Sequence, residues 1–261
     1  MSFKTGTLAR PVRVVKPGPD VVLEASFAWQ GPFERVFVKL ANENRRCIEA
    51  VCAWIAQDAG LPCPEPRFVQ VARGKMPRDV AWPFGESTNL AFCTVAIPNA
   101  RQLAKLDSGW AADQLGKWPW LEVAGVFDEL IANDDRSNGN VLLDGRASMW
   151  LIDHGRALGG GGQRLFSTEL FPPFKNYFLE MIAQEAMPKK LQRKNVLLSA
   201  SYEMAARAPR VPYGDLMVPE PLALQISSIL TRRAASLPAM VLEAARIPDL
   251  YDAGESSRSL Q

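Results

Sequence analysis

The sequence predicts an α+β fold in which a strand-rich first part precedes a mainly helical second part. Over residues 1–40, short stretches of β-branched and aromatic residues alternate with turns that contain Gly and Pro. Beyond residue 100, apolar residues recur mostly at helical spacing. We therefore expect two units, residues 1–97 and 98–261, with a hinge near residues 96–100.

The composition permits a sizeable core and indicates no unusual partner. The chain has 261 residues, 48% of them hydrophobic, and its 30 basic residues nearly balance its 28 acidic ones. A net charge of +2 gives no electrostatic reason to expect nucleic acid or an anionic membrane as the main partner. The N-terminus lacks the apolar segment of a signal peptide, and no run approaches the roughly 18 apolar residues of a spanning helix. We expect a soluble, cytoplasmic protein.

The cysteines and the single histidine give little support for zinc binding or for a catalytic nucleophile. No two cysteines form a CxxC pair and all lie in apolar segments, so we expect buried free thiols at Cys47, Cys52, Cys63 and Cys93. His154 is the only histidine, which leaves a zinc site or a Ser-His-Asp unit without enough partners.

The elements of the first part follow from their residue patterns. We expect an antiparallel sheet with strands at residues 11–15, 21–27, 35–40, 67–72 and 90–96. Between the third and fourth strands, apolar residues fall at helical spacing from Asn44 to Ala59, and Gly60 and Pro62 end that helix.

The second part is predicted to be helical except for one hairpin. A helix begins near residue 118, and short strands at 140–144 and 148–153 follow it as an antiparallel pair. From residue 180 onward the pattern is helical again, with breaks expected at Pro188 and Pro238.

A polar loop, DDRSNGN at residues 134–140, lies between an apolar helical run and an apolar strand. A surface turn is the simplest explanation, because Asp, Asn, Gly and Ser favour turns. An EF-hand calcium loop is excluded, because Arg136 and Gly145 stand where oxygen ligands are required. Phosphoryl transfer is the other functional interpretation. It requires a carboxylate near the attacking hydroxyl and oxygen ligands for magnesium.

Asp135, Asn140 and Asp153 fit that requirement together. Asn140 opens the first strand of the hairpin and Asp153 closes the second, so their oxygens can meet over one cation beside Asp135. Such a site also needs a lysine on a strand and a helical glutamate to hold it. Lys39 lies in the strand VFVKL, and Glu49 is preferred over Glu43, which can simply stabilise the helix N-terminus.

These segments resemble those of a known family. NDDRSNGNVLL…WLIDHG resembles the catalytic and metal-binding segments of the HipA-like kinases, and also the DRxxxN…ID arrangement of phosphatidylinositol kinases. FVKL, a helix with glutamate and AGLPCPEP are similar to the K…E…GLPVPEP run of HipA-like proteins. In that run the glutamate precedes the glycine by the same spacing as Glu49 precedes Gly60. The resemblance covers roughly residues 11–158.

The resemblance implies a two-lobed protein-kinase-like fold. It also implies an enzyme that uses ATP and Mg²⁺ to phosphorylate a Ser or Thr of a protein. It also implies roles for single residues. Asp135 would be the catalytic base, Asn140 and Asp153 the metal ligands, and Lys39 and Glu49 the ion pair that holds the phosphates. No motif identifies the phosphate acceptor or an antitoxin-like partner.

Two features depart from the kinase pattern. The loop KPGPD at residues 16–20 has one glycine and two prolines, which donate no N–H to a phosphate. His154 follows the metal-binding Asp153, where protein kinases usually have Phe. We expect His154 to pack or to hydrogen-bond, and a titrating role is the alternative.

Other interpretations remain open at this point. The loop 16–20 suggests a non-catalytic nucleotide-binding or regulatory protein, although intact Lys39, Asp135 and Asp153 favour an enzyme. An enzyme of this fold could also act on a lipid or small molecule, or transfer another part of ATP.

The arginines near the site have expected roles of their own. Arg136 is expected to be a structural partner of a nearby carboxylate or carbonyl, with a substrate phosphate as the alternative. Arg156 is expected to be solvated, with contact to an acidic or phosphorylated partner as the alternative.

Overall fold

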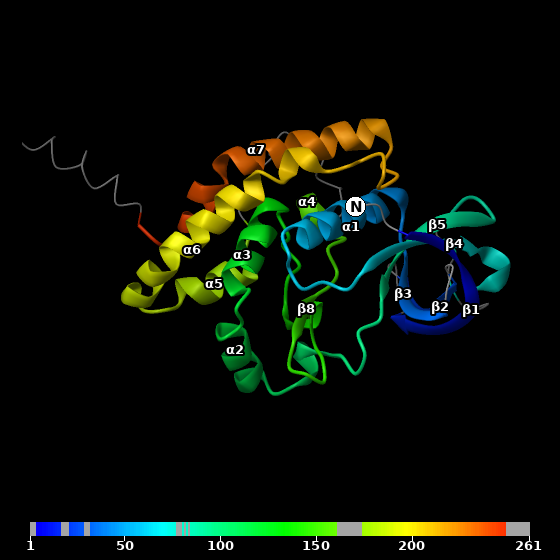
Figure 1. Ribbon diagram of the computed structural model, residues 1–261, viewed down its shortest axis with the longest axis horizontal. Helices are drawn as coiled ribbons and strands as arrows, with labels where there is room; N and C mark the ends of the chain where they lie inside the picture. The colour runs from blue at the N-terminus through cyan, green and yellow to red at the C-terminus, as the bar shows by residue number, and fades with distance from the viewer. Residues whose placement is uncertain are drawn as a thin grey trace, which may run out of the picture.

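The computed structural model describes residues 4–16, 21–28, 32–76, 80, 82, 84–160 and 174–248. Residues 17–20 of the KPGPD loop lie outside these ranges. The chain combines a strand-rich N-terminal part with a mainly helical C-terminal part, as expected (Figure 1). None of the described helices is long and apolar enough to cross a membrane.

The first part is a closed barrel with the strand order β1-β2-β3-β5-β4. Its strands are β1 (Lys4–Lys16), β2 (Val21–Ala28), β3 (Glu34–Leu40), β4 (Pro66–Ala72) and β5 (Thr88–Val95). Our expectation of a wholly antiparallel sheet is wrong at one pairing, because residues 4–7 of β1 lie parallel to residues 67–70 of β4. This pairing closes the barrel, and it explains why β1 begins before the predicted residues 11–15.

The second part consists of helices around a small sheet. The helices are α2 (Ser108–Gly116), α3 (Leu121–Leu130), α4 (Ala157–Gly160), α5 (Tyr177–Ala183), α6 (Met187–Ala205) and α7 (Glu220–Ala244). The sheet has the order β6-β7-β8, with β6 (Arg101–Gln102), β7 (Val141–Leu143) and β8 (Met149–Leu151). Pro188 lies in the first turn of α6. The predicted break at Pro238 is wrong, because the buried neighbours Leu237 and Val241 keep α7 packed through that turn.

Helix α1 (Glu43–Asp58) lies between these two parts. It begins at the cap residue Asn42, whose side chain accepts a hydrogen bond from the Arg45 N–H. Glu43 occupies the first turn, as expected. The four cysteines are free and buried, which confirms that prediction, and two of them, Cys47 and Cys52, lie on α1.

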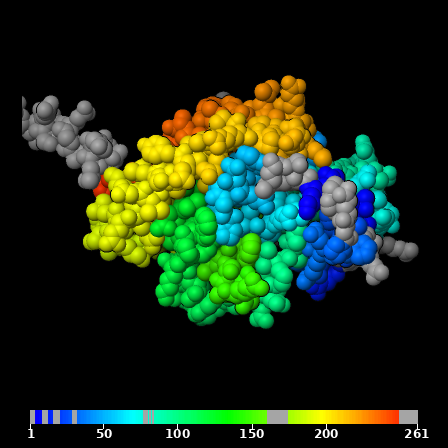
Figure 2. All heavy atoms as spheres, viewed as in Figure 1, coloured from blue at the N-terminus to red at the C-terminus, as the bar shows by residue number. Residues whose placement is uncertain are grey.

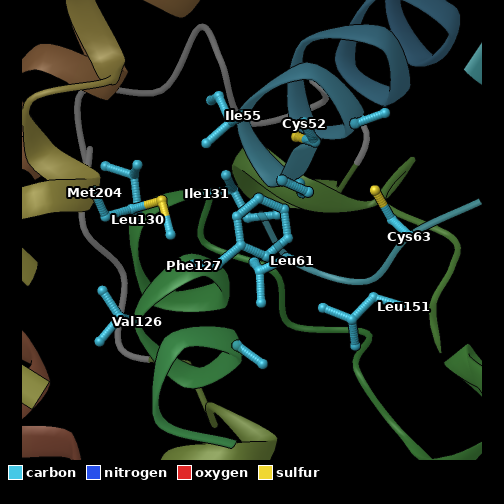
Figure 3. Close-up of a cluster of buried hydrophobic side chains, with 14 of the residues drawn as sticks. Cys52, Ile55, Leu61, Cys63, Val126, Phe127, Leu130, Ile131, Leu151 and Met204 are labelled. Atoms are coloured by element: carbon cyan, nitrogen blue, oxygen red, sulfur yellow. The ribbon is translucent and has the colours of Figure 1, made fainter. Parts of the chain in front are cut away.

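Two hydrophobic cores divide the molecule at an unexpected place. The barrel encloses its own core, whereas the buried side of α1 belongs to the core of the second part. Figure 3 shows Cys52 and Ile55 of α1 beside Phe127 and Leu130 of α3 and Met204 of α6. In Figure 2 the dark-blue atoms of the barrel lie at one end of the molecule, next to the light-blue atoms of α1. Helix α1 therefore holds its side chains in a fixed place relative to the helices, beside the barrel.

Candidate active site

Lys39 joins the barrel to two carboxylates from distant parts of the sequence. On β3 the alternate residues Val38 and Leu40 are buried inside the barrel, so Lys39 points outward. Its Nζ forms an ion pair with Glu49 of α1 and lies 3.0 Å from Oδ1 of Asp153, which follows β8. The structure thus brings together three of the residues selected from the sequence.

This contact fixes the charge of the lysine. Burial alone would lower the pKa of Lys39, but the carboxylates of Glu49 and Asp153 raise it above its ordinary value. Burial raises the pKa of Glu49, and two partners oppose that rise. They are the Lys39 ammonium and the backbone N–H of His154, which donates to Glu49 Oε2 at 3.1 Å. Lys39 is therefore a charged ammonium beside the hairpin.

The β7–β8 hairpin places Asn140 beside Asp153. Val141 pairs with Leu151, and the Ile152 N–H donates to the carbonyl of Asn140 at 3.1 Å. Asp153 has a φ of 63°, a left-handed conformation that Asp adopts more readily than most residues. Its backbone therefore turns sharply two residues after β8 ends, and its carboxylate reaches Lys39.

Asp135 lies beside this pair in the polar loop. The side-chain amide of Asn140 donates to the carbonyl of Asp135 at 2.7 Å, which orients the amide and directs its oxygen away from this bond. The N–H of Asp135 donates to Oδ1 of Asn133 at 3.3 Å. The Asp135 carboxylate is 36% exposed, and Nη1 of Arg156 lies 3.3 Å from its Oδ1. The carboxylate is therefore accessible and faces a cation.

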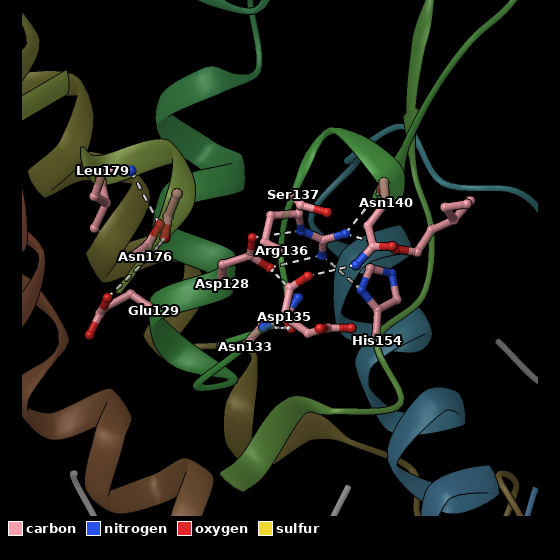
Figure 4. Close-up of polar contacts among 12 residues, drawn as sticks. Asp128, Glu129, Asn133, Asp135, Arg136, Ser137, Asn140, His154, Asn176 and Leu179 are labelled. Carbon is pink, nitrogen blue, oxygen red and sulfur yellow. Dashed lines mark hydrogen bonds and ion pairs between the residues drawn. The ribbon is translucent and has the colours of Figure 1, made fainter. Parts of the chain in front are cut away.

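A buried ion pair holds this loop in shape (Figure 4). Arg136 and Asp128 of α3 are joined by two hydrogen bonds of 2.8 and 2.9 Å, and both side chains are fully buried. Arg136 also donates to the carbonyls of Asn140 and Ile152 and to Nδ1 of His154. These bonds use all five N–H donors of the guanidinium. The structural role expected for Arg136 is confirmed.

His154 is a neutral packing residue. Burial and the nearby cations Arg136 and Lys39 lower its pKa well below the ordinary value. Because arginine can only donate, Nδ1 of His154 accepts the 3.0 Å hydrogen bond from Arg136 and the ring proton is on Nε2. The ring also packs edge-on against Phe127, with 5.3 Å between the ring centroids. The expectation that His154 packs and hydrogen-bonds is confirmed.

Gly155 allows the chain to pass close to Glu49. A Cβ at this position would lie 3.1 Å from Oε1 of Glu49, closer than most real contacts allow. The absence of a side chain therefore lets the turn after Asp153 approach the carboxylate that holds Lys39.

Some residues of the site were not selected from the sequence. Asp128 stands in the apolar run VFDELIA, and a carboxylate on the buried face of a helix requires a partner, which is the signal that could have identified it. Arg233 of α7 donates to the carbonyls of Glu129 and Leu130 at the C-terminal end of α3. It thereby anchors the helix that leads into the polar loop, and no local pattern distinguishes it from a surface arginine.

The donor set fits a magnesium ion shared with a nucleotide. Within the described ranges, no group of three or more His, Cys, Asp or Glu side chains could hold a metal. Asn140 and Asp153 would contribute an amide oxygen and a carboxylate. Magnesium in phosphoryl-transfer sites is typically held by one or two protein groups together with phosphate oxygens and water.

Comparisons with known proteins identify the family of the chain and its fold. The family model described as HipA-like kinase matches residues 34–205, more than half of the chain. No curated protein sequence matches the chain. Among solved structures, the proinflammatory kinase CtkA of Helicobacter pylori has a TM-score of 0.60 at 15% identity, over 95% of this chain and 100% of that chain. That likeness shows the fold, which is kinase-like, and the family match shows what kind of enzyme adopts it here. The chain is a phosphotransferase that belongs to the HipA-like kinase family.

Proposed function

We propose that this kinase transfers the γ-phosphoryl group of ATP, in a magnesium-dependent reaction, to a Ser or Thr hydroxyl of a protein. The observation that carries the proposal is the meeting of Lys39 from the barrel with Glu49 and Asp153, in a chain of the HipA-like kinase family. In phosphoryl transfer, a lysine–glutamate ion pair of this kind holds the phosphates of ATP, and oxygen ligands of this kind hold magnesium.

The two-lobed arrangement is part of the proposal. Residues 1–97 and 98–261 would form the lobes, with the nucleotide between the barrel and the β7–β8 hairpin. Support comes from Lys39, which lies on the barrel and contacts Asp153 beyond the hairpin. Helix α1 would carry Glu49 at the junction, because its buried side shares the core of the helices. The free thiols suit the reducing cytoplasm, where we place the protein.

Lys39 and Glu49 would position the nucleotide. When the phosphates bind, the Lys39 ammonium would exchange its contact with Asp153 for the α- and β-phosphate oxygens, while Glu49 keeps it in place. Asp153 would then be released to bind magnesium with Asn140. The metal would supply charge neutralisation for the phosphate oxygens.

Asp135 would act as the base. Its carboxylate would accept the proton of the acceptor hydroxyl as the hydroxyl oxygen bonds to the γ-phosphorus. The bond from the γ-phosphorus to the bridging oxygen breaks, and ADP leaves with the electron pair. Because Asp135 is partly exposed and oriented through the Asn133 side chain, it can receive a proton without moving the loop.

Replacing Asp153 by alanine is expected to abolish magnesium-dependent nucleotide binding. The change removes the carboxylate of the proposed metal pair, whereas Asn140 alone is one ligand too few. A thermal-shift titration with ATP, with and without magnesium, measures this effect. The parent should gain a magnesium-dependent rise in melting temperature, because a ligand that binds the folded state stabilises it.

Asp135→Ala is the matched control, since it removes a carboxylate from the same site without removing a proposed metal ligand. It should keep the magnesium-dependent shift. An unchanged shift in Asp153→Ala would contradict the metal assignment, and no shift in the parent at millimolar ATP would favour a non-catalytic protein.

Intact-mass analysis of candidate acceptors tests which group is transferred. After incubation with ATP, it separates phosphate addition from nucleotide addition. A phosphorylated lipid or small molecule would contradict the protein acceptor.

A further inference from the structure

The turn after Asp153 presents a single cation to the candidate base. Among residues 154–158 only Arg156 is exposed, and its four neighbours are buried. Both ends of the turn are anchored. The His154 N–H donates to Glu49, and the Leu158 N–H donates to the carbonyl of Ile131 at 2.7 Å. The Ala157 N–H closes the turn onto the carbonyl of His154. Arg156 therefore extends from a fixed backbone.

The guanidinium of Arg156 is directed at Asp135 and keeps its donors available. Its Nη1 lies 3.3 Å from Asp135 Oδ1, and its side chain is 52% exposed. Within the described residues this ion pair is the contact that holds the side chain, and the guanidinium donates no hydrogen bond beside it. The polar loop 134–140 contains one cation, Arg136. By contrast with Arg156, every N–H donor of the Arg136 guanidinium is used inside the protein.

The reaction needs positive charge on the acceptor side. Negative charge spreads over the three outer oxygens of the phosphoryl group while it moves, and arginine can stabilise this charge by donating from a fixed fork. Lys39 is held by Glu49 on the barrel side, and Arg136 has no donor left. Among the residues that the structure describes, Arg156 is the cation that lies against the base, where the acceptor oxygen and the phosphoryl group would meet.

We propose that Arg156 is a catalytic residue that leaves Asp135 when MgATP and the acceptor bind, and donates hydrogen bonds to the phosphoryl group in transit. This inference rests on the proposed function of the site. Release from Arg156 also frees Oδ1 of Asp135 to accept the hydroxyl proton. No proton leaves the guanidinium, and the bonds made and broken are those of the transfer itself.

Steady-state kinetics of Arg156→Gln and Arg156→Lys test the proposal. The assay measures magnesium-dependent ADP release by the full chain at varied ATP, with water or the protein itself as acceptor. Loss of a donor to the developing charge should lower kcat by about 100-fold or more in Arg156→Gln. The KM for ATP should stay within about twofold, because the lost contact exists in the transition state alone. Arg156→Lys should recover part of kcat, since it keeps the charge without the fork.

Arg246→Gln is the matched control. Arg246 is also an exposed arginine paired with a carboxylate, Glu180, at 3.2 Å on α5. Arg246→Gln should keep the kcat of the parent. Arg246→Gln and Arg156→Gln should both keep the melting temperature of the parent. If the parent turns over ATP and Arg156→Gln keeps its kcat, exceeds it or changes KM alone, the inference is wrong and the proposed function stands. A parent without any magnesium-dependent ATP turnover would overturn both.

Discussion

Asp135→Ala is expected to reduce phosphoryl transfer by about 10²–10⁴-fold, the usual contribution of a general base. Nucleotide binding should be unchanged. The Lys39–Glu49 pair and the Asn140 contact to the Asp135 carbonyl do not involve the lost carboxylate. Transfer of radioactive phosphate from labelled ATP, alongside a thermal-shift titration, measures the two quantities separately.

The neighbouring residue provides the control for this change. Asp134 is exposed, carries the same carboxyl group and lies in the same loop. Asp134→Ala should transfer phosphate at the rate of the parent. If Asp134→Ala and Asp135→Ala lose the same activity, the effect belongs to the loop and Asp135 is not the base.

Asp128→Ala is expected to produce the largest loss of stability in this region. The substitution leaves the fully buried Arg136 without its carboxylate, and breaking a buried ion pair in this way costs about 3–5 kcal/mol of the free energy of unfolding. Urea denaturation measures this value. Because Arg136 also binds the carbonyls of Asn140 and Ile152, magnesium-dependent nucleotide binding should weaken in the same variant.

Asp113→Ala serves as the control for Asp128→Ala. Asp113 pairs with Lys117 one helical turn away, and both side chains are largely exposed. Loss of the Asp113 carboxylate should lower the free energy of unfolding by about 0.5 kcal/mol or less. Equal costs for the two variants would show that the Asp128–Arg136 pair does not hold the loop.

Local patterns were sufficient for most of the fold. The predicted strand at 35–40 and the predicted helix from Asn44 to Ala59 agree within one residue with β3 and α1. Alternation in VFVKL places Lys39 outside the barrel, and helical spacing buries the face of α1 that carries Glu49. The pairing of the two residues could therefore be expected before the structure was known.

Contacts between distant segments were not predictable in this way. The first residues of β1 pair with β4, and no short-range pattern specifies which edge a strand joins. The buried role of Asp128 depends on Arg136 from the following loop, and the exposure of Arg156 depends on anchors in α1 and at Ile131. These features arise from tertiary packing, which a periodic pattern of apolar residues does not contain.

A structure of the protein with a non-hydrolysable ATP analogue and magnesium tests the central claim most directly. The account predicts magnesium about 2.0–2.1 Å from oxygens of Asn140 and Asp153, the usual distance for this ion. It also predicts that Lys39 contacts the phosphates while it keeps its ion pair with Glu49. Nucleotide bound elsewhere, or a metal bound without Asn140 and Asp153, would contradict the assignment of this site.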